Sequence, residues 1–190
     1  MPTVVERVTA DRALERVQNA LGDRVDQVVL NFNQVDLVCE PARLPEVVQI
    51  LKDDDGLRFQ FFTFLSAIDR SEFGGEDDKE ERERTGSSLE LLVHLYSPAY
   101  VMHVNIHVPM DTSAPSAPTI TGIFRGANWH DRETHEMFGI HFEGHPRLVN
   151  LYLPEDFEGH PGLRSFKLPT RLVKEWPGAK DPEEAAAGGR

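Results

Sequence analysis

Hydrophobic residues in the first fifty positions recur with the spacing of two helices and, between them, of two strands. A first helix is predicted between Thr9, which can cap it, and Gly22, which suits the position just past its end. Its apolar face would consist of Ala13, Leu14, Val17 and Leu21. Residues 25–31 and 35–40 favour strands, and the asparagine-containing turn between them predicts a β-hairpin.

A second helix is predicted between Pro41 and the polar stop signal at 53–56. Its apolar face would consist of Leu44, Val47, Val48 and Leu51. Residues 59–68 then form a nearly continuous apolar run that is too short for most helices. Such a run predicts a strand near the centre of the sheet, covered on at least one face.

Two further strands are predicted at residues 89–96 and 101–108. In the second of these, apolar and polar positions alternate strictly, as expected for a strand with one buried face. Residues 72–86, which precede this pair, are bounded by glycine and crowded with charge. We therefore expect a solvated hairpin loop there.

The remaining pattern predicts a linker, one more helix and a tail. Residues 111–118 are rich in proline and predict the linker, and Thr119 or Thr121 can start a helical stretch towards Met137. Beyond Pro169 there is no amphipathic period, so that segment should not fold by itself.

These elements predict an α+β protein. We expect a two-layer α/β sandwich with a mixed sheet of about five strands, helices on one face and an extended C-terminal arm. The α/β domain would comprise residues 1–125. Residues 126–168 would pack on it and on a partner, and residues 169–190 would form the tail.

Composition excludes several functional classes. The chain has 190 residues and 39% hydrophobic content, enough for one core, and its net charge of −12 argues against nucleic acid as the main partner. The single cysteine, Cys39, cannot form an internal disulfide or supply an iron–sulfur site by itself. No dinucleotide fingerprint, phosphate loop, export signal or membrane-spanning run occurs, so we expect a cytosolic chain that meets a membrane only through a partner.

A pentapeptide, Phe-Glu-Gly-His-Pro, occurs at Phe142–Pro146 and again at Phe157–Pro161. Glycine admits left-handed backbone and proline makes the preceding residue extended, so each copy predicts a bend that presents a histidine. For His145 and His160 we favour a structural role, in which they cap or hydrogen-bond backbone carbonyls of their own turns, because no nucleophile or oxyanion donor accompanies them.

Charged residues crowd the helix that precedes the first copy of this repeat. Arg132 and Glu136 are four apart, as are Asp131 and His135, which predicts ion pairs on a helix. The alternative is a metal or acid/base site that uses the four side chains His130, Glu133, Glu136 and His145. The histidine spacing does not match a zincin motif, so the ion pairs are favoured.

Three other groups of residues carry candidate functions. His94, His103 and His107 predict a polar stripe across two strands that faces solvent or an interface. Aromatic residues gather in the last third of the chain and suit a buried protein interface: Trp129, Phe138, Phe142, Tyr152, Phe157 and Trp176. A basic strip follows them and would attract an acidic partner surface: Arg164, Lys167, Arg171 and Lys174.

The chain resembles the 30 kDa subunit family of respiratory complex I, which is the NADH-quinone oxidoreductase of bacteria, most specifically over about residues 128–177. The resemblance is carried by Asn128-Trp129, Arg132-Glu133, Glu136 to Ile140, Gly144-His145-Pro146, Leu151, Leu153-Pro154 and Glu158-Gly159-His160-Pro161. It implies a cofactor-free subunit of the peripheral arm that docks on the quinone-site (49 kDa-type) subunit, beside iron–sulfur subunits. FMN and the iron–sulfur clusters would belong to those partners, and the complex would lie at the cytoplasmic face of the bacterial membrane.

The resemblance also assigns partner-binding residues. They are Trp129, Arg132, Glu133, Glu136, Phe138, His145, Pro146, His160, Pro161, Arg164 and Trp176. Arg132, Glu133 and Glu136 would form partly buried ion pairs that hold the helix to the loop. The chain alone would not be catalytic. Two alternatives stay open, namely the equivalent subunit of a complex-I-like hydrogenase or other electron-input complex, and a free-standing metal-dependent hydrolase.

Overall fold

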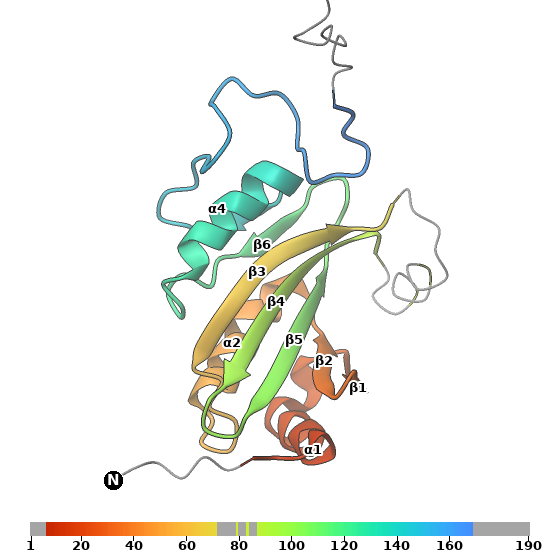
Figure 1. Cartoon of the computed structure of the whole chain (residues 1–190), viewed down its shortest axis with the longest axis vertical. Coiled ribbons are helices and arrows are strands. Elements are labelled where there is room, and N and C mark those ends of the chain that lie inside the picture. Colours follow the sequence, from red (N-terminus) through yellow and green to blue (C-terminus); the bar gives the residue numbers. More distant parts are fainter. Residues whose placement is uncertain (1–6, 72–78, 80–82, 84–86, 169–190) are drawn as a thin grey trace, which may run out of the picture.

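Five strands form the central sheet of the computed structural model, which describes residues 7–71, 79, 83 and 87–168 (Figure 1). They are β1 (Gln27–Asn31), β2 (Gln34–Val38), β3 (Phe61–Asp69), β4 (Leu89–Ser97) and β5 (Met102–Pro109), in the spatial order β1-β2-β5-β4-β3. Strands β2 and β5 run parallel and the other neighbours run antiparallel. The predicted α+β class and mixed sheet are confirmed.

Helices α1 (Ala10–Leu21) and α2 (Leu44–Asp53) cover one face of this sheet, and Figure 1 shows α2 behind β3, β4 and β5. Short 3-10 turns follow α1 at Gly22–Arg24 and precede α2 at Pro41–Arg43. Both helices bury the faces that their apolar spacing predicts, because Val17, Leu21, Val47 and Leu51 are inaccessible to solvent. They share one core with the strand residues Leu37, Leu91, Val93, Val104 and Ile106.

The β1–β2 hairpin forms as predicted, with Asn31 paired to Gln34 across a two-residue turn. Both turn residues, Phe32 (φ 48°) and Asn33 (φ 62°), have left-handed backbone, which this type of tight turn requires. Asparagine tolerates that region, whereas it is unfavourable for a bulky ring. The Phe32 side chain is 93% exposed, so no packing offsets this strain.

Strand β3 lies at the edge of the sheet, so the prediction of a central strand at residues 59–68 was wrong. The run is apolar for two other reasons. Phe59 precedes the strand and is fully buried, with its N–H bonded to the carbonyl of Leu51. Within the strand, Leu65 and Ala67 enter the core while Phe62 packs against Phe124 and His130, which cover its flank.

Strands β3 and β4 pair antiparallel, as a hairpin connection requires. Most of the charged loop predicted at 72–86, and the tail beyond Pro169, lie outside the described residues. No helix within the described part of the chain is long and apolar enough to cross a membrane.

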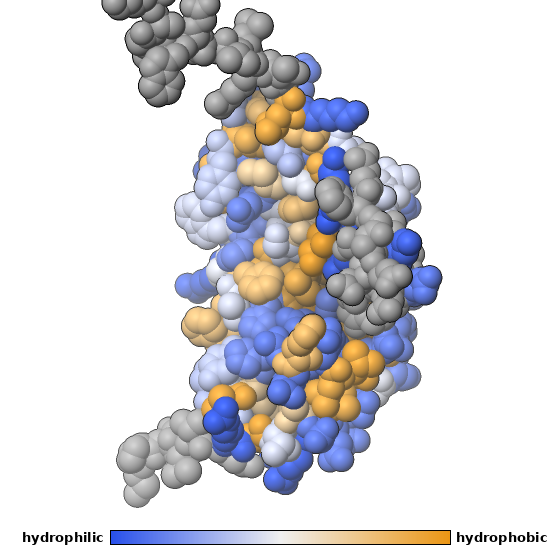
Figure 2. All heavy atoms as spheres, turned by 45° about the vertical axis from the view of Figure 1, so that its right-hand side comes forward, coloured by the Kyte–Doolittle hydropathy of each residue, from blue (hydrophilic) through white to orange (hydrophobic). Residues whose placement is uncertain are grey.

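The sheet face opposite α1 and α2 carries a polar network, and Figure 2 shows hydrophilic and hydrophobic side chains mixed on the part of the surface that is not grey. His107 lies 3.3 Å from Glu90 and 3.7 Å from Asp36, and Arg70 bonds Glu90 at 2.5 Å. Burial would raise the pKa of Glu90, but hydrogen bonds and charge from His107 and Arg70 hold that pKa below its usual value. The network is therefore a set of buried, paired charges.

The predicted polar stripe of histidines is thus only partly correct. His103 is half-buried and lies 3.2 Å from His94, nitrogen to nitrogen, while His94 and His107 are buried. Neighbouring side chains on the same face supply the cover, because the ring of Phe64 stacks on His94 and that of Tyr96 lies 4.6 Å from His103. The stripe is a packed surface of rings and paired charges.

A second, two-stranded sheet forms where the sequence predicted only a linker and a bend. Strand β6 (Ser116–Pro118) pairs parallel with β7 (His141–Glu143), and helix α4 (Ala127–Phe138) connects them. The helix starts at Ala127, later than expected from Thr119 or Thr121. Both hydroxyls instead bond the carboxylate of Asp131 within α4, so they fix the approach to the helix without capping it.

Relief of the strained turn should stabilise the protein. We expect Phe32→Asn to raise the free energy of unfolding by about 0.5–1 kcal/mol, because asparagine accepts left-handed backbone and the exposed ring makes no compensating contact. Urea unfolding measures the change. The same substitution at Phe61, a strand residue whose ring meets Tyr96 edge-on, serves as the control and should destabilise. Equal effects at both positions would contradict the strain argument.

Candidate functional site

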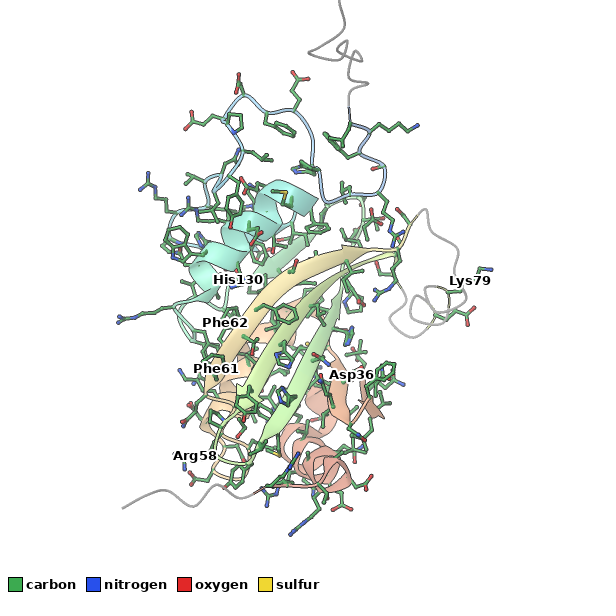
Figure 3. The ribbon with its side chains drawn as sticks, in the orientation of Figure 1. Asp36, Arg58, Phe61, Phe62, Lys79 and His130 are labelled. Carbon is green, nitrogen blue, oxygen red and sulfur yellow. The ribbon has the colours of Figure 1, made fainter. Side chains whose placement is uncertain are left out.

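Helix α4 lies along the free edge of β3, as Figure 1 shows. His130 Nδ1 lies 3.1 Å from the carbonyl oxygen of Leu65 and 3.4 Å from its N–H nitrogen, so the imidazole occupies backbone positions that an edge strand leaves open. Figure 3 shows His130 close to β3, near Phe62. Further along the chain, Arg164 donates from its N–H to the Asp69 carboxylate and from Nε to the Asp69 carbonyl. The segment after residue 125 is thus fixed to β3 at two points.

The side chains of Arg132 and Glu136 form hydrogen bonds to the backbone of the loop that follows β7. Arg132 donates from Nε to the carbonyl of Val149 and from Nη2 to that of Asn150, each at 2.9 Å. The Glu136 carboxylate accepts hydrogen bonds from the N–H groups of three consecutive residues, Leu151, Tyr152 and Leu153, at 2.8 to 3.2 Å. One turn of helix therefore pairs its positive side chain with carbonyls and its negative side chain with amides.

The predicted ion pairs do not form in the described part of the chain. Arg132 and Glu136 bind backbone, and Asp131 binds Thr119 and Thr121 while His135 Nδ1 lies 2.8 Å from the carbonyl of Ile140. Backbone groups compete with the oppositely charged side chains for these bonds. A buried backbone group without a partner costs about 1–3 kcal/mol of stability, which is more than a surface ion pair contributes. Glu136 is buried, so its carboxylate needs several donors, and the loop supplies them.

Asp131 is fully buried with only hydroxyl partners. Burial raises its pKa to about 6, and the hydrogen bonds from Thr119 and Thr121 and the charge of His130 oppose only part of that rise. Its second oxygen, Oδ1, has no hydrogen-bond partner among the described residues, and the same holds for Oγ1 of Thr134, one turn further along the same helix. The helix therefore holds an incompletely bonded carboxyl group in its buried face.

The two copies of the pentapeptide bind opposite ends of α4. His145 Nε2 lies 3.2 Å from the carbonyl of Asn128 near the start of the helix, and His160 Nδ1 lies 2.9 Å from the carbonyl of Glu136 near its end. Gly144 (φ 76°) and Gly159 (φ 90°) have left-handed backbone, as the repeat predicts. The preference for structural histidines agrees with these bonds, although the carbonyls belong to α4 and not to the turns themselves.

Two glycines at the end of α4 make room for the second copy. A Cβ on Gly139 would lie 2.9 Å from the His160 ring, and one on Gly162 would lie 2.8 Å from the carbonyl oxygen of Met137. Gly162 also donates its N–H to that carbonyl at 2.7 Å. The second copy of the pentapeptide can therefore pack against the end of α4 because these two positions are glycines without a side chain.

Apolar side chains are left exposed on this segment. Of the seven large hydrophobic residues that are exposed in the described part of the chain, five lie between positions 129 and 168: Trp129, Val149, Tyr152, Phe157 and Leu168. Trp129 is 61% and Tyr152 65% exposed. Because Arg132 lies 5.4 Å from the Trp129 ring and bonds Val149, and Glu136 bonds Tyr152, these three lie near one another. We call Trp129, Val149 and Tyr152 the aromatic surface.

The other residues assigned to partner binding occupy different positions. Glu133 is half-buried and makes no hydrogen bond or ion pair within the described residues. Phe138 is partly buried against the core and touches Gly162, Pro146 is exposed, and Pro161 is half-buried. Trp176, with Arg171 and Lys174 of the basic strip, lies outside the described residues.

Sequence reasoning missed Val149 and Arg147. Neither belongs to a motif, and exposure of a single valine or arginine in a loop has no signature in sequence. Arg147 is exposed, and its side chain makes no hydrogen bond or ion pair within residues 7–71 and 87–168.

The structure does not assemble the residues of the hydrolase alternative. His130 binds β3, Glu136 binds residues 151–153 and His145 binds Asn128, so three of its four side chains serve different backbone segments. Among the described residues, no group of three or more histidine, cysteine, aspartate or glutamate side chains is arranged to hold a metal ion. Cys39 is buried, and burial raises the pKa of its thiol to about 12, so the thiol stays protonated at neutral pH.

The sequence is similar to that of known proteins. The family model described as "Respiratory-chain NADH dehydrogenase, 30 Kd subunit" matches residues 37–172. An NADH-quinone oxidoreductase subunit from Salinispora arenicola is 33% identical over 170 residues, covering 90% of this chain and 64% of the relative. The protein of the same name from Roseiflexus sp. is 36% identical over 143 residues, covering 75% of each. This chain thus spans slightly less than two thirds of the Salinispora protein.

Solved structures share the fold. The trypsin-resistant fragment (1–134) of Nqo5 superposes with a TM-score of 0.57 at 22% identity, over 72% of this chain and 99% of the fragment. A chain from the membrane-bound sulfane sulfur reductase, described as an archaeal respiratory membrane complex, superposes with a TM-score of 0.67 at 16% identity, over 90% of this chain and 96% of the other. At these identities the likeness shows the fold alone.

Glu136 should be essential for the order of the loop in the isolated chain. We expect Glu136→Gln to lower the free energy of unfolding by about 1–3 kcal/mol, because the amide replaces one accepting oxygen and leaves at least one partly buried N–H without its acceptor. Hydrogen exchange at residues 151–153 should become faster. Glu133→Gln is the matched control on the same helix and should change neither quantity. Unchanged exchange at residues 151–153 in Glu136→Gln would refute this role.

Asp131 should make stability depend on pH. Its folded pKa of about 6 lies above the ordinary 3.8, so its contribution is complete below about pH 4 and is lost as pH rises through 6. We expect Asp131→Asn to exceed the wild type in stability at pH 7, by up to about 3 kcal/mol more than at pH 4. Urea unfolding at both values measures this. A difference between the two proteins that does not vary with pH would show that folding leaves the pKa of Asp131 unshifted.

Proposed function

This chain belongs to the family of the respiratory-chain NADH dehydrogenase 30 kDa subunit, and from that premise we propose that it is a structural subunit of a proton-translocating NADH:quinone oxidoreductase. It lies in the peripheral arm, holds no cofactor of its own and docks on the quinone-site subunit through the segment after residue 125. Electrons pass through FMN and iron–sulfur clusters of neighbouring subunits. The complex places the chain at the cytoplasmic face of the bacterial membrane.

The observation that supports docking is the concentration of exposed apolar side chains on one segment. Trp129 and Tyr152 are of the types that contribute most to binding at protein interfaces. Exposed aromatic side chains gathered on one surface are favoured when a partner covers them, because their apolar area is then removed from water. Among the described residues, two large hydrophobic side chains are exposed outside this segment, Phe32 in the β1–β2 turn and Phe61 in β3, and they form no comparable group.

The charged residues of the same segment support a structural role rather than a catalytic one. Arg132 and Glu136 hold the loop that carries Val149 and Tyr152, and His145 and His160 hold the repeat to the ends of α4. A catalytic acid or base needs a side chain free to meet a substrate.

Glu133 differs from these residues. It is the half-buried carboxylate of α4 without a partner in the described residues, and it lies one turn from Trp129 on the same face. It is therefore available to a donor on the partner.

Assembly tests the proposal. We expect Trp129→Ala to weaken association with the partner at least about 30-fold and Glu133→Ala to reduce it measurably, while both variants keep the wild-type unfolding midpoint. Each variant replaces the native chain in cells, the complex is purified from membranes, and the retained chains are identified and quantified. Gln49→Ala, an exposed position on α2, is the control for nonspecific effects.

Three outcomes would contradict the proposal. In the first, the wild-type chain retains no redox subunits, and in the second, Trp129→Ala assembles as well as the wild type. In the third, Glu133→Ala assembles normally but abolishes turnover, which would assign chemistry to this chain. The identities of the retained chains also decide whether the electron-input subunits oxidise NADH or belong to a hydrogenase or another complex.

A further inference from the structure

A hollow opens beside the aromatic surface, with a volume of about 570 Å³. Its lining residues come from α4 and from the loop that follows β7: Arg132, Arg147, Val149, Asn150, Leu153, Pro154 and Glu155. Two of these, Arg132 and Val149, also contact or belong to the aromatic surface. The hollow and the aromatic surface are therefore continuous.

The charge of this hollow differs from that of the protein. Two guanidinium groups and one carboxylate line it, whereas the whole chain has a net charge of −12. Arg132 uses Nε and Nη2 to bind two backbone carbonyls, which do not neutralise its charge. The side chains of Arg147 and Glu155 make no ion pair or hydrogen bond within the described residues. The lining of the hollow thus carries a net positive charge on an otherwise acidic protein.

The backbone holds Arg147 in position although its side chain is exposed. Its N–H donates to Nδ1 of His145 at 3.1 Å, and Nε2 of the same ring lies 3.2 Å from the carbonyl of Asn128. Residue 147 is thereby fixed near the start of α4, and its guanidinium can swing over the hollow. A cation on a fixed backbone loses less freedom on binding than one on a mobile loop.

We propose that this hollow receives an aspartate or glutamate side chain of the subunit that docks on the aromatic surface, with its carboxylate bound by Arg147 and an apolar neighbour packed on Trp129 and Val149. This inference rests on the proposed function, because it names the chemistry of the partner at the same surface. Arginine binds a carboxylate through two parallel N–H bonds, which fixes orientation as well as attraction. Arg147 thereby sets the register in which the partner docks.

Paired charge changes test the assignment in the full chain. We expect Arg147→Glu to weaken retention of the partner at least about tenfold, and Arg147→Lys only a few-fold, because lysine keeps the charge but loses the two-bond geometry. Arg125→Glu is the matched control, since Arg125 is exposed just before α4 and does not line the hollow. It should weaken retention less than about threefold. All three variants should keep the wild-type unfolding midpoint.

A zero-length carbodiimide reagent identifies the carboxylate directly. In the assembled complex, the Arg147→Lys variant offers an amine that the reagent joins as an amide to a carboxylate within contact distance, and mass spectrometry of the peptides locates the junction. We expect position 147 to be joined to an aspartate or glutamate of the partner. Junctions at other lysines with none at position 147 would overturn the assignment.

The failure of this inference differs from the failure of the proposed function. If Trp129→Ala loses the partner but Arg147→Glu and Arg125→Glu weaken retention equally, or not at all, the surface docks without a carboxylate in the hollow. If the wild-type chain retains no partner, or Trp129→Ala has no effect, both proposals fall.

Discussion

The Glu136 carboxylate, bound by the N–H groups of three consecutive residues, is the interaction on which the surface of this protein depends. Without it the loop at 149–153 would lose the acceptor that its amides share. Arg132, one turn earlier, takes the carbonyls of the two preceding residues, so a single helical turn fixes five backbone groups in a row. The fixed backbone determines where the exposed side chains of Val149 and Tyr152 lie. It also shapes the hollow that Arg132 and Val149 line.

In this segment, carboxylate side chains are buried and aromatic side chains are exposed, which is the reverse of their usual distribution. Asp131 and Glu136 are buried and bind hydroxyls and amides, while Trp129 and Tyr152 are exposed. Burial of a charge is costly unless hydrogen bonds compensate it. The loop supplies these bonds to Glu136, whereas the two threonines bond one oxygen of Asp131 and leave its pKa raised. The result is a rigid support whose outer surface is apolar. A partner that covers it removes apolar area from water without reordering the polar groups beneath.

Elements with a local signature could be predicted from the sequence, and contacts between distant segments could not. The apolar spacing of α1 and α2, the hairpin at Asn33 and the alternation in β5 are all properties of neighbouring residues. An apolar run does not reveal which element covers it. The run at residues 59–68 predicted a central strand, but β3 is an edge strand whose free edge is covered by α4. Helical spacing likewise predicted a pair between Arg132 and Glu136, because nothing local indicates that a loop about fifteen residues away binds both. The repeat predicted its glycine conformations but not that its histidines bind α4.

In the function that we propose, α4 and its bound loop form a preassembled surface that a partner covers. Hydroxyl-radical footprinting of the isolated chain and of the purified complex tests it most directly, since Trp129 and Tyr152 are exposed in the isolated chain and so is Phe32 at the far hairpin. We expect strong oxidation of all three side chains in the isolated chain. In the complex, Trp129 and Tyr152 should be protected while Phe32 stays reactive. Equal reactivity of Trp129 and Tyr152 in both samples would contradict the account.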